Sequence, residues 1–379
     1  MIATSTVLAI ALVLPAVGQG GLRFERQKLG DVTYEAASAL DVNNDGAVDI
    51  VSGGVWFEGP QFLAQHKITD VMPVGDYFDD FSDFPMDVNG DGYVDIVTGG
   101  YFGGTLRWEE NPGGRDEPWT VHVIAETGPI ERCCFYDIDG DGFLEILPVT
   151  SPVRIFRLKR DSHGCAGGEF EEFRIMQEGG GGHGIGFGDI DGDGHADIAF
   201  AGGWFEAPAD TWTGEWRWHP EWDLGSASVP ILVHDVNRDG LADIIVGQAH
   251  DYGLDWWEQG KAPGGERTWT KHSIDSGRSQ YHELVLADID NDREPELITG
   301  KRYWAHCGHD PGERDPIGLY YFDIDNGRFV RHTIDYGPPS RASGTGIYLW
   351  IADVDGNGWK DIVAPGKEGL YLFRNLGRL

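Results

Sequence analysis

The sequence predicts an all-β fold, a seven-bladed β-propeller with a calcium-binding loop in each blade. Three observations lead to this prediction. A ten-residue motif rich in Asp and Asn occurs seven times between Asp41 and Asp361. Its copies recur about every 50 residues, a spacing typical of propellers and other repeat folds. The segments before the motifs alternate polar and apolar residues, as half-buried strands do.

Each motif places oxygen-bearing side chains at positions 1, 3, 5 and 9, and six of the seven copies have Gly at position 6. A hard cation such as Ca²⁺ needs about 6 to 8 oxygen ligands, and Gly permits the positive φ that lets the carboxylates converge. The predicted calcium ligands are Asp41, Asn43, Asp45 and Asp49; Asp87, Asn89, Asp91 and Asp95; Asp137, Asp139, Asp141 and Glu145; Asp189, Asp191, Asp193 and Asp197; Asp235, Asn237, Asp239 and Asp243; Asp288, Asp290, Asp292 and Glu296; and Asp353, Asp355, Asn357 and Asp361.

The loops differ from EF-hands because strand-like sequences such as IVSGG and IVTGG follow them directly. One such motif alone is also compatible with an ordinary hairpin turn, but seven aligned copies favour cation binding. We expect the sixth and seventh sites to be the weakest. Arg293 replaces Gly in the sixth motif, and Asn357 replaces Asp in the seventh.

The order of the expected strands indicates how the ring closes. The alternating segment Arg23–Asp31 precedes the first loop, whereas the last repeat ends after its third strand, GLYLFRN. We therefore predict that Arg23–Asp31 completes the seventh blade and covers edges that would otherwise be exposed.

Composition restricts the partners. The formal charge is −34, so nucleic acids and anionic membranes are unfavourable partners. The segment Ile2–Val17 is apolar, and it ends in a pattern of small residues typical of a cleavage site. We therefore predict that residues 1–18 are a signal peptide. Residues 19–379 then form one propeller domain, secreted or periplasmic, and no other stretch is apolar enough to span a membrane.

The predicted topology puts the seven loops on one face and gathers other side chains at the opposite mouth. The candidate catalytic residues there are His183, His250, His282, His306, Tyr303, Lys301 and Arg302. Neutral imidazoles ligate transition metals or transfer protons near pH 7, and a transition metal or Mg²⁺ is an optional cofactor at this rim. A structural role is expected for five histidines at one register of the outer strands: His66, His122, His219, His272 and His332.

The aromatic and cysteine residues allow several interpretations. Trp56, Trp108, Trp204 and Trp257 pack between blades or stack on a sugar ring. Cys133 and Cys134 are either a vicinal disulfide or two small buried residues. Cys165 could pair with Cys307, and Cys307 between His306 and His309 also allows a zinc site.

Over nearly all of the mature chain the motifs resemble the FG-GAP or VCBS repeats of secreted bacterial proteins. A narrower likeness, in GGGGHGIGFGDIDGDG, GQAHDYGLDWWEQ and GKRYWAHCGHDPGERDPIGLYYF, is to the propeller domain of aldos-2-ulose dehydratases, lyases that act on oxidised sugars. This chain stops at the propeller, so we expect the isomerisation assigned to the cupin domains of that family to be absent.

The resemblance implies β-elimination next to a sugar ketone, which needs a base, an acid and a group that stabilises an enolate. In this hypothesis His183 and His282 are base and acid or metal ligands, Tyr303 and His250 assist proton transfer, and Lys301 and Arg302 stabilise the enolate. Two alternatives remain. One is a non-enzymatic, integrin-like propeller that binds carbohydrate or protein, and the other is a lyase of uronate polysaccharides.

Overall fold

The computed structural model describes residues 21–176 and 178–378, in which the chain forms strands β1 to β30 and no helix. The all-β prediction is confirmed. The predicted signal peptide, residues 1–18, lies outside the described residues. Among the described residues, no helix has the length and apolarity needed to cross a membrane.

Five sheets have four strands each. Their strands are β2 (Ser38–Leu40), β3 (Asp49–Ser52), β4 (Val55–Phe57) and β5 (Gln65–Lys67); β8 (Phe84–Met86), β9 (Asp95–Gly99), β10 (Thr105–Glu110) and β11 (Thr120–Glu126); β12 (Cys133–Tyr136), β13 (Glu145–Pro148), β14 (Arg154–Arg160) and β15 (Ala166–Arg174); β24 (Tyr281–Ala287), β25 (Glu296–Lys301), β26 (Ile317–Asp325) and β27 (Arg328–Gly337); and β28 (Trp350–Ala352), β29 (Asp361–Ala364) and β30 (Leu370–Arg378) with β1 (Leu22–Gly30).

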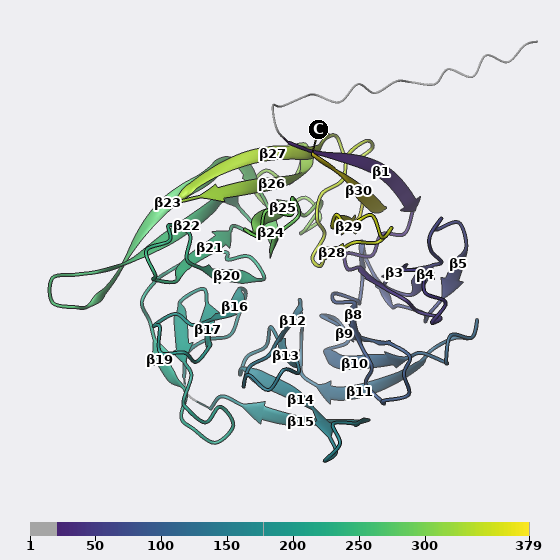
Figure 1. Ribbon diagram of the computed structural model, residues 1–379, viewed down its shortest axis with the longest axis horizontal. Coiled ribbons are helices and arrows are strands. Elements are labelled where there is room, and N and C mark those ends of the chain that lie inside the picture. Colours follow the sequence, from purple (N-terminus) through teal and green to yellow (C-terminus); the bar gives the residue numbers. More distant parts are fainter. Residues whose placement is uncertain (1–20, 177, 379) are drawn as a thin grey trace, which may run out of the picture.

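An eight-stranded sheet consists of two antiparallel four-stranded units. They are β16 (Ile185–Gly188), β17 (Asp197–Phe200), β18 (Gly203–Glu206) and β19 (Arg217–His219), followed by β20 (Ile231–His234), β21 (Asp243–Gly247), β22 (Tyr252–Lys261) and β23 (Arg267–Ser279). The two units are joined by a short parallel pairing between β16 and β20. The first strands β8, β12, β16, β20, β24 and β28 lie nearest a common centre (Figure 1).

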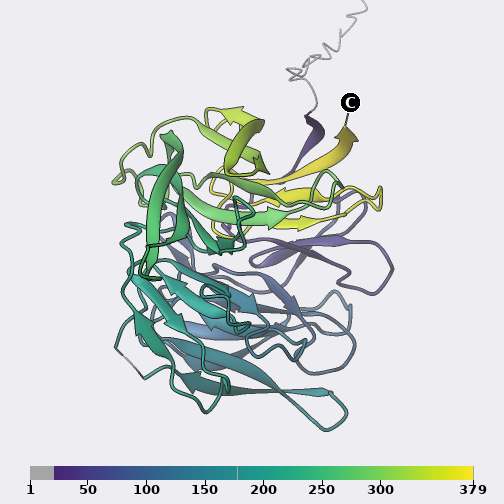
Figure 2. The same cartoon turned by 60° about the vertical axis from the view of Figure 1, so that its left-hand side comes forward.

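The two ends of the described chain meet in one sheet. β1 pairs antiparallel with β30, with Glu25 opposite Arg374 and Lys28 opposite Tyr371. Figure 2 shows the purple first strand beside the yellow last strand. The predicted outer strand Arg23–Asp31 therefore adds to the sheet of the last repeat, as β1.

The core lies between neighbouring sheets. All residues of the second strand in each unit are buried, for example Asp49–Ser52 in β3 and Asp197–Phe200 in β17. One apolar cluster joins Leu147 of β13 to Ile198 of β17. A strand covered on both faces requires a continuous apolar run, which explains sequences such as DIVT and DIAF after the loops.

In five of the four-stranded units, an aromatic ring of the third strand stacks on a histidine of the fourth strand. The ring centroids lie 4.2 to 4.6 Å apart in the pairs Trp56–His66, Trp108–His122, Trp204–His219, Trp256–His272 and Tyr321–His332. Each imidazole also contacts a carboxylate two residues after its aromatic partner: Glu58, Glu110, Glu206, Glu258 and Asp323. In the fourth unit of this kind the repeated position is occupied by Trp256 rather than by the predicted Trp257.

Two segments outside the repeat pattern contact each other. The first contains the hairpin β6 (Pro73–Val74) and β7 (Tyr77–Phe78), and the second is the loop after β25. The Tyr77 hydroxyl donates a hydrogen bond of 2.6 Å to the carbonyl of Ala305, and Trp304 Nε1 donates to Asp76 at 3.2 Å. The four cysteines are free, and Cys133 and Cys134 are buried, so the small buried-residue interpretation applies and the two disulfide alternatives do not.

Candidate active site

Glu131 lies at the centre of the candidate site. It precedes β12, and its Oε2 is 2.9 Å from Nε2 of His183. Its other oxygen, Oε1, lies 3.0 Å from Nε2 of His282 and 3.0 Å from Nη1 of Arg302. One carboxylate thus connects two imidazoles and a guanidinium from separate repeats.

His183 and His250 face each other. Their Nε2 atoms are 3.1 Å apart, and each ring has a partner for its other nitrogen. His183 Nδ1 lies 2.5 Å from the carbonyl oxygen of Ala227, and His250 Nδ1 lies 3.1 Å from Oδ2 of Asp310. Because a carbonyl and a carboxylate accept hydrogen bonds, both Nδ1 atoms act as donors, and both Nε2 atoms point into the site, where that of His183 also lies beside the Glu131 carboxylate.

The backbone around His183 explains part of the glycine run before and after it. Gly184 has a φ of +92°, a conformation that L side chains rarely adopt. A Cβ at this position would lie 2.6 Å from the Cβ of Ala227, the residue whose carbonyl binds His183. Gly184 therefore allows the chain to approach Ala227 closely enough to hold the imidazole.

His306 and Asp310 complete the open side of the cluster. The His306 ring stacks on His250 with centroids 4.0 Å apart, and its Nδ1 lies 2.9 Å from Oδ1 of Asp310. Asp310 thus contacts both rings through its two oxygens. The side chain of His306 is 49% exposed and that of His282 is 0% exposed, so solvent reaches the cluster from the His306 side.

The surroundings of the two facing imidazoles shift their pKa values in opposite directions. Burial, followed by the charge of His183, lowers the pKa of His250 to about 3. Burial also opposes the charge on His183, but the adjacent Glu131 carboxylate raises the pKa of His183 above its usual value. Burial together with the Arg302 charge holds the pKa of His282 well below its usual range. One proton shared by His183 and His250 gives a charged and a neutral imidazole side by side.

The donor set also fits a metal ion. One ligand atom from each of Glu131, His183, His250 and His282 lies within 4.8 Å of the others. Three imidazoles and a carboxylate suit Zn²⁺ or another first-row transition metal better than Mg²⁺, which prefers oxygen ligands. The outward hydrogen bonds of His183 and His250 turn both Nε2 atoms toward the centre of the cluster, the orientation that metal ligation requires once His183 is deprotonated.

The other predicted catalytic residues lie in different surroundings. Arg302 is 2% exposed, and its Nε binds Glu35 at 2.9 Å in addition to the contact with Glu131. The Lys301 amino group binds Ser279 Oγ at 3.2 Å and the Gly312 carbonyl. Burial lowers the pKa of Lys301 to about 8. Tyr303 packs near Trp304 and shares no described hydrogen bond with the four imidazoles.

Glu131 and Asp310 are not among the catalytic residues that the sequence predicts. Glu131 stands six residues before the first Asp of its loop, the same register as His183 and His282. That register was the available signal for Glu131. Asp310 lies in the loop after β25, outside the repeats, where register gives no information.

The seven acidic loops share one hydrogen-bond pattern. The position 9 carboxylate accepts the backbone N–H of position 2 at 2.8 to 3.0 Å in every loop: Asp49, Asp95, Glu145, Asp197, Asp243, Glu296 and Asp361. The position 1 carboxylate accepts the N–H of position 6 in every loop, including the loop with Arg293. Arg293 adopts a φ of +78°, close to the +91° of Gly142. The sixth loop therefore keeps the shape of the others, although the positive φ of Arg293 strains the backbone and lowers the free energy of unfolding by about 1 kcal/mol or more.

In at least three loops the carboxylates of positions 1, 3 and 9 converge within 4.8 Å. These sets are Asp137, Asp139 and Glu145; Asp189, Asp191 and Asp197; and Asp288, Asp290 and Glu296. Burial, together with the neighbouring acids, raises the pKa of Glu145 to about 7. Such a group of carboxylates gains stability from a bound cation.

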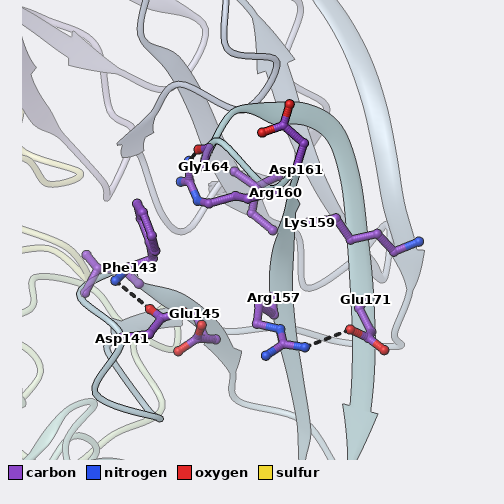
Figure 3. A pocket seen from close by; sticks show the side chains of 11 residues that line it. Asp141, Phe143, Glu145, Arg157, Lys159, Arg160, Asp161, Gly164 and Glu171 are labelled. Atoms are coloured by element: carbon purple, nitrogen blue, oxygen red, sulfur yellow. Dashed lines mark hydrogen bonds and ion pairs between the residues drawn. The ribbon is translucent and has the colours of Figure 1, made fainter.

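A surface pocket of about 410 Å³ lies beside the third loop and away from the imidazoles. Figure 3 shows Phe143 on one side and Arg157 and Lys159 from β14 on the other, and the Arg160 guanidinium reaches over the Phe143 ring, 4.0 Å from its centroid. Arg157 is paired with Glu171 at 3.0 Å. The pocket shares no lining residue with the Glu131 cluster.

One family of known proteins matches part of the chain. The FG-GAP-like repeat family matches residues 87–147 and 235–299. Together with the all-β architecture, this match supports a β-propeller-like repeat fold. No curated protein sequence matches the chain significantly.

Three solved structures resemble the chain at low identity. A rhamnogalacturonan lyase, YesW, is 13% identical, with a TM-score of 0.46, and the match covers 94% of this chain and 74% of the lyase. The biofilm matrix protein Bap1 of V. cholerae is 16% identical, with a TM-score of 0.34 over 85% of this chain. A Tc holotoxin pore of Photorhabdus luminescens is 14% identical, with a TM-score of 0.36 over 84% of this chain. This chain spans 42% of the length of Bap1 and 15% of the toxin chain.

Proposed function

We propose that this protein is a carbohydrate-active lyase that eliminates water or an alcohol from an oxidised sugar at the Glu131 cluster. The observation that carries the proposal is the pair of facing imidazoles, His183 and His250, beside a buried carboxylate. Their opposite pKa shifts favour a charged His183, which can donate a proton, beside a neutral His250, which can accept one. The narrower sequence likeness to aldos-2-ulose dehydratases is consistent with this chemistry.

The reaction needs two proton transfers. The neutral imidazole of the pair removes the acidic proton next to the sugar ketone, and the C–H electron pair becomes an enolate. The enolate then re-forms the ketone with a new C=C bond as the C–O bond on the neighbouring carbon breaks. The charged imidazole donates its proton to the departing oxygen, so that water or an alcohol leaves and no net proton is consumed.

Arg302 acts through Glu131 in this proposal. Its guanidinium is bound to Glu35 and Glu131 and is buried, so it orients the carboxylate that faces His183 and His282. Lys301 has no direct part in the central proton transfers, because its amino group is held by Ser279 and Gly312. Tyr303 has none either, because it shares no described hydrogen bond with the four imidazoles.

A metal ion is compatible with the same residues. Glu131, His183, His250 and His282 would hold it, and when bound it would supply a positive charge that polarises a sugar carbonyl. In that state the imidazoles act as ligands, and the outward bonds to Ala227 and Asp310 orient them.

We also propose that the fold is a closed seven-bladed propeller. The eight-stranded sheet counts as two blades, which together with the five four-stranded sheets makes seven. The pairing of β1 with β30 closes the ring. The acidic loops bind calcium, as their shared shape and converging carboxylates support, and residues 1–18 direct secretion.

The test is a substrate screen with matched variants. Oxidised monosaccharides, 3-keto-glycosides and uronate polymers are incubated with the protein, and the ultraviolet absorbance of an unsaturated product is followed. His183→Gln and His250→Gln should each lose activity by at least about 100-fold. The control His163→Ala changes an exposed histidine at the end of the β14–β15 hairpin and should retain full activity.

The outcomes separate the three hypotheses. Product from keto-sugars that depends on both histidines supports the proposal. Product from uronate polymers alone indicates the polysaccharide lyase. Saturable carbohydrate binding without product, or activity that survives both substitutions, overturns the assignment.

A further inference from the structure

Three buried carboxylates gather in the sheet β8–β11, away from the acidic loops and from the Glu131 cluster. Asp80 is 1% exposed, and Asp83 and Glu109 are 0% exposed. Glu109 lies in β10, and the two aspartates lie in the segment before β8. Burial, followed by the charge of Asp80, raises the pKa of both Asp83 and Glu109, so the three carboxyl groups are near neighbours.

Glu109 replaces an aromatic core residue. It follows Trp108, the ring that stacks on His122, and it lies opposite Ile96 of β9. The residue after the stacked ring in the four other units of this kind is Phe57, Phe205, Trp257 or Phe322. Each of these also lies opposite an Ile or Leu of the preceding strand. One four-stranded unit thus places a carboxylate where four other units place an aromatic ring.

The hydrogen bonds around the group leave several oxygens without a partner. Thr98 Oγ1 donates to Asp80 Oδ1 at 2.6 Å, and the Gly53 N–H donates to Asp83 Oδ2 at 2.8 Å. The remaining oxygens, Asp80 Oδ2, Asp83 Oδ1 and both oxygens of Glu109, are buried and have no protein hydrogen-bond donor. The nearby Asp79 carboxylate is instead satisfied by the N–H groups of Phe102 and Gly103.

One cation faces the three carboxylates. Arg107 lies 3.9 Å from an oxygen of Asp80 and 3.9 Å from an oxygen of Glu109, beyond hydrogen-bond distance. If all four groups are ionised, the net charge is −2, which a buried environment cannot accommodate without compensation. A divalent cation would balance this charge and provide a partner for the four unpaired oxygens.

We propose that Glu109, Asp80 and Asp83 form a buried site for a divalent cation, with calcium as its occupant. The site belongs to the interior of sheet β8–β11 and differs from the acidic loops, whose ligands come from one hairpin. Its ion ties the segment before β8 to strand β10. The inference does not depend on the proposed lyase activity.

Equilibrium dialysis at saturating free calcium tests the site. Glu109→Gln removes the charge and keeps the shape. Glu109→Phe introduces the residue that three other sheets carry at this position, so it remains informative if the Gln variant does not fold. The control Glu126→Gln changes an exposed carboxylate of β11 in the same sheet.

The wild type and Glu126→Gln should bind equal amounts of calcium, and each Glu109 variant should bind one equivalent less. Calcium should also raise the melting temperature of the wild type more than that of Glu109→Phe. Equal calcium content in all the proteins would overturn the proposal, because the carboxyl groups would then be neutralised by shared protons.

Discussion

The Nε2 atoms of His183 and His250 face each other at 3.1 Å. Two neutral imidazoles that both donate through Nδ1 would bring two lone pairs together. A proton or a metal ion between the two nitrogens removes that repulsion. The hydrogen bonds to Ala227 and Asp310 fix this orientation before any substrate is present.

In the metal-free protein we expect His183 to carry the shared proton. The Glu131 carboxylate raises the pKa of His183, whereas burial lowers that of His250 to about 3. At pH 5 to 6, ¹⁵N NMR of the ring nitrogens should show a charged His183 and a neutral His250. Replacing Glu131 by Gln should move the His183 titration to lower pH. Identical titration of both rings would contradict this assignment.

Addition of Co²⁺ should distinguish ligation from proton sharing. The Glu131, His183, His250 and His282 donor set predicts visible absorption bands on addition of Co²⁺. His282→Ala should weaken the binding by at least about 10-fold, whereas His163→Ala should leave it unchanged. Equal spectra for these two variants would argue that the cluster serves proton transfer alone.

Glu368 should make stability depend on pH. Burial raises the pKa of Glu368 from 4.5 to about 7. The folded state therefore favours the protonated group. The resulting stabilisation is complete below pH 4.5 and is lost as the pH rises through about 7. Its Oε1 accepts the N–H of Gly344 at 2.6 Å, a bond that the Gln side chain can keep.

Glu368→Gln should consequently gain stability relative to the wild type between pH 5 and pH 8, by about 1 to 3 kcal/mol. Denaturant unfolding at both pH values, with calcium saturating, measures the difference. Glu126→Gln provides the exposed control. A constant difference across this pH range would show that Glu368 is ionised throughout.

The stacked histidines of the outer strands should be structural. His219 lies on Trp204 with ring centroids 4.4 Å apart, and its Nε2 is 2.6 Å from Glu206. His219→Ala removes the stack and the hydrogen bond, so unfolding free energy should fall by about 1 to 3 kcal/mol. Any lyase activity should stay within about twofold below the melting temperature. Loss of activity in a stably folded variant would assign this histidine to function.

The sequence predicts the all-β class and the register of the loops because the repeats impose both. Seven motifs at one spacing locate the buried second strands, and alternation locates outer strands such as β1. Register also places His183 and His282 in one layer. It does not reveal how each side chain is used, since Glu131 shares that register and becomes the carboxylate that joins them.

Features outside the repeats could not be predicted in this way. The long loop after β25 contains Trp304, Ala305 and Asp310. Its path depends on contacts with the β6–β7 hairpin. Lys301 and Arg302 are adjacent in sequence, yet Arg302 binds Glu131 and Lys301 binds Ser279. Neighbouring residues of an extended chain point to opposite sides, so adjacency in sequence does not bring the Lys301 amino group to the carboxylate that Arg302 binds.

Asp197 and Asp193 of the fourth loop should differ in what they contribute without calcium. Asp197 accepts the N–H groups of Ile190 and Ala207 at 2.8 and 2.9 Å and is 1% exposed. Asp193 is exposed and accepts the N–H of His195. In the presence of a chelator, Asp197→Ala should therefore lower unfolding free energy by about 2 to 4 kcal/mol, because two buried N–H groups lose their acceptor. Asp193→Ala should cost less than about 1 kcal/mol.

With calcium, both variants should lose the same increment of calcium-dependent stabilisation, since each removes one ligand of a single ion. Thermal unfolding with and without calcium measures both effects. If Asp193→Ala kept the full calcium-dependent increment, the fourth loop would be a hairpin turn held by hydrogen bonds alone.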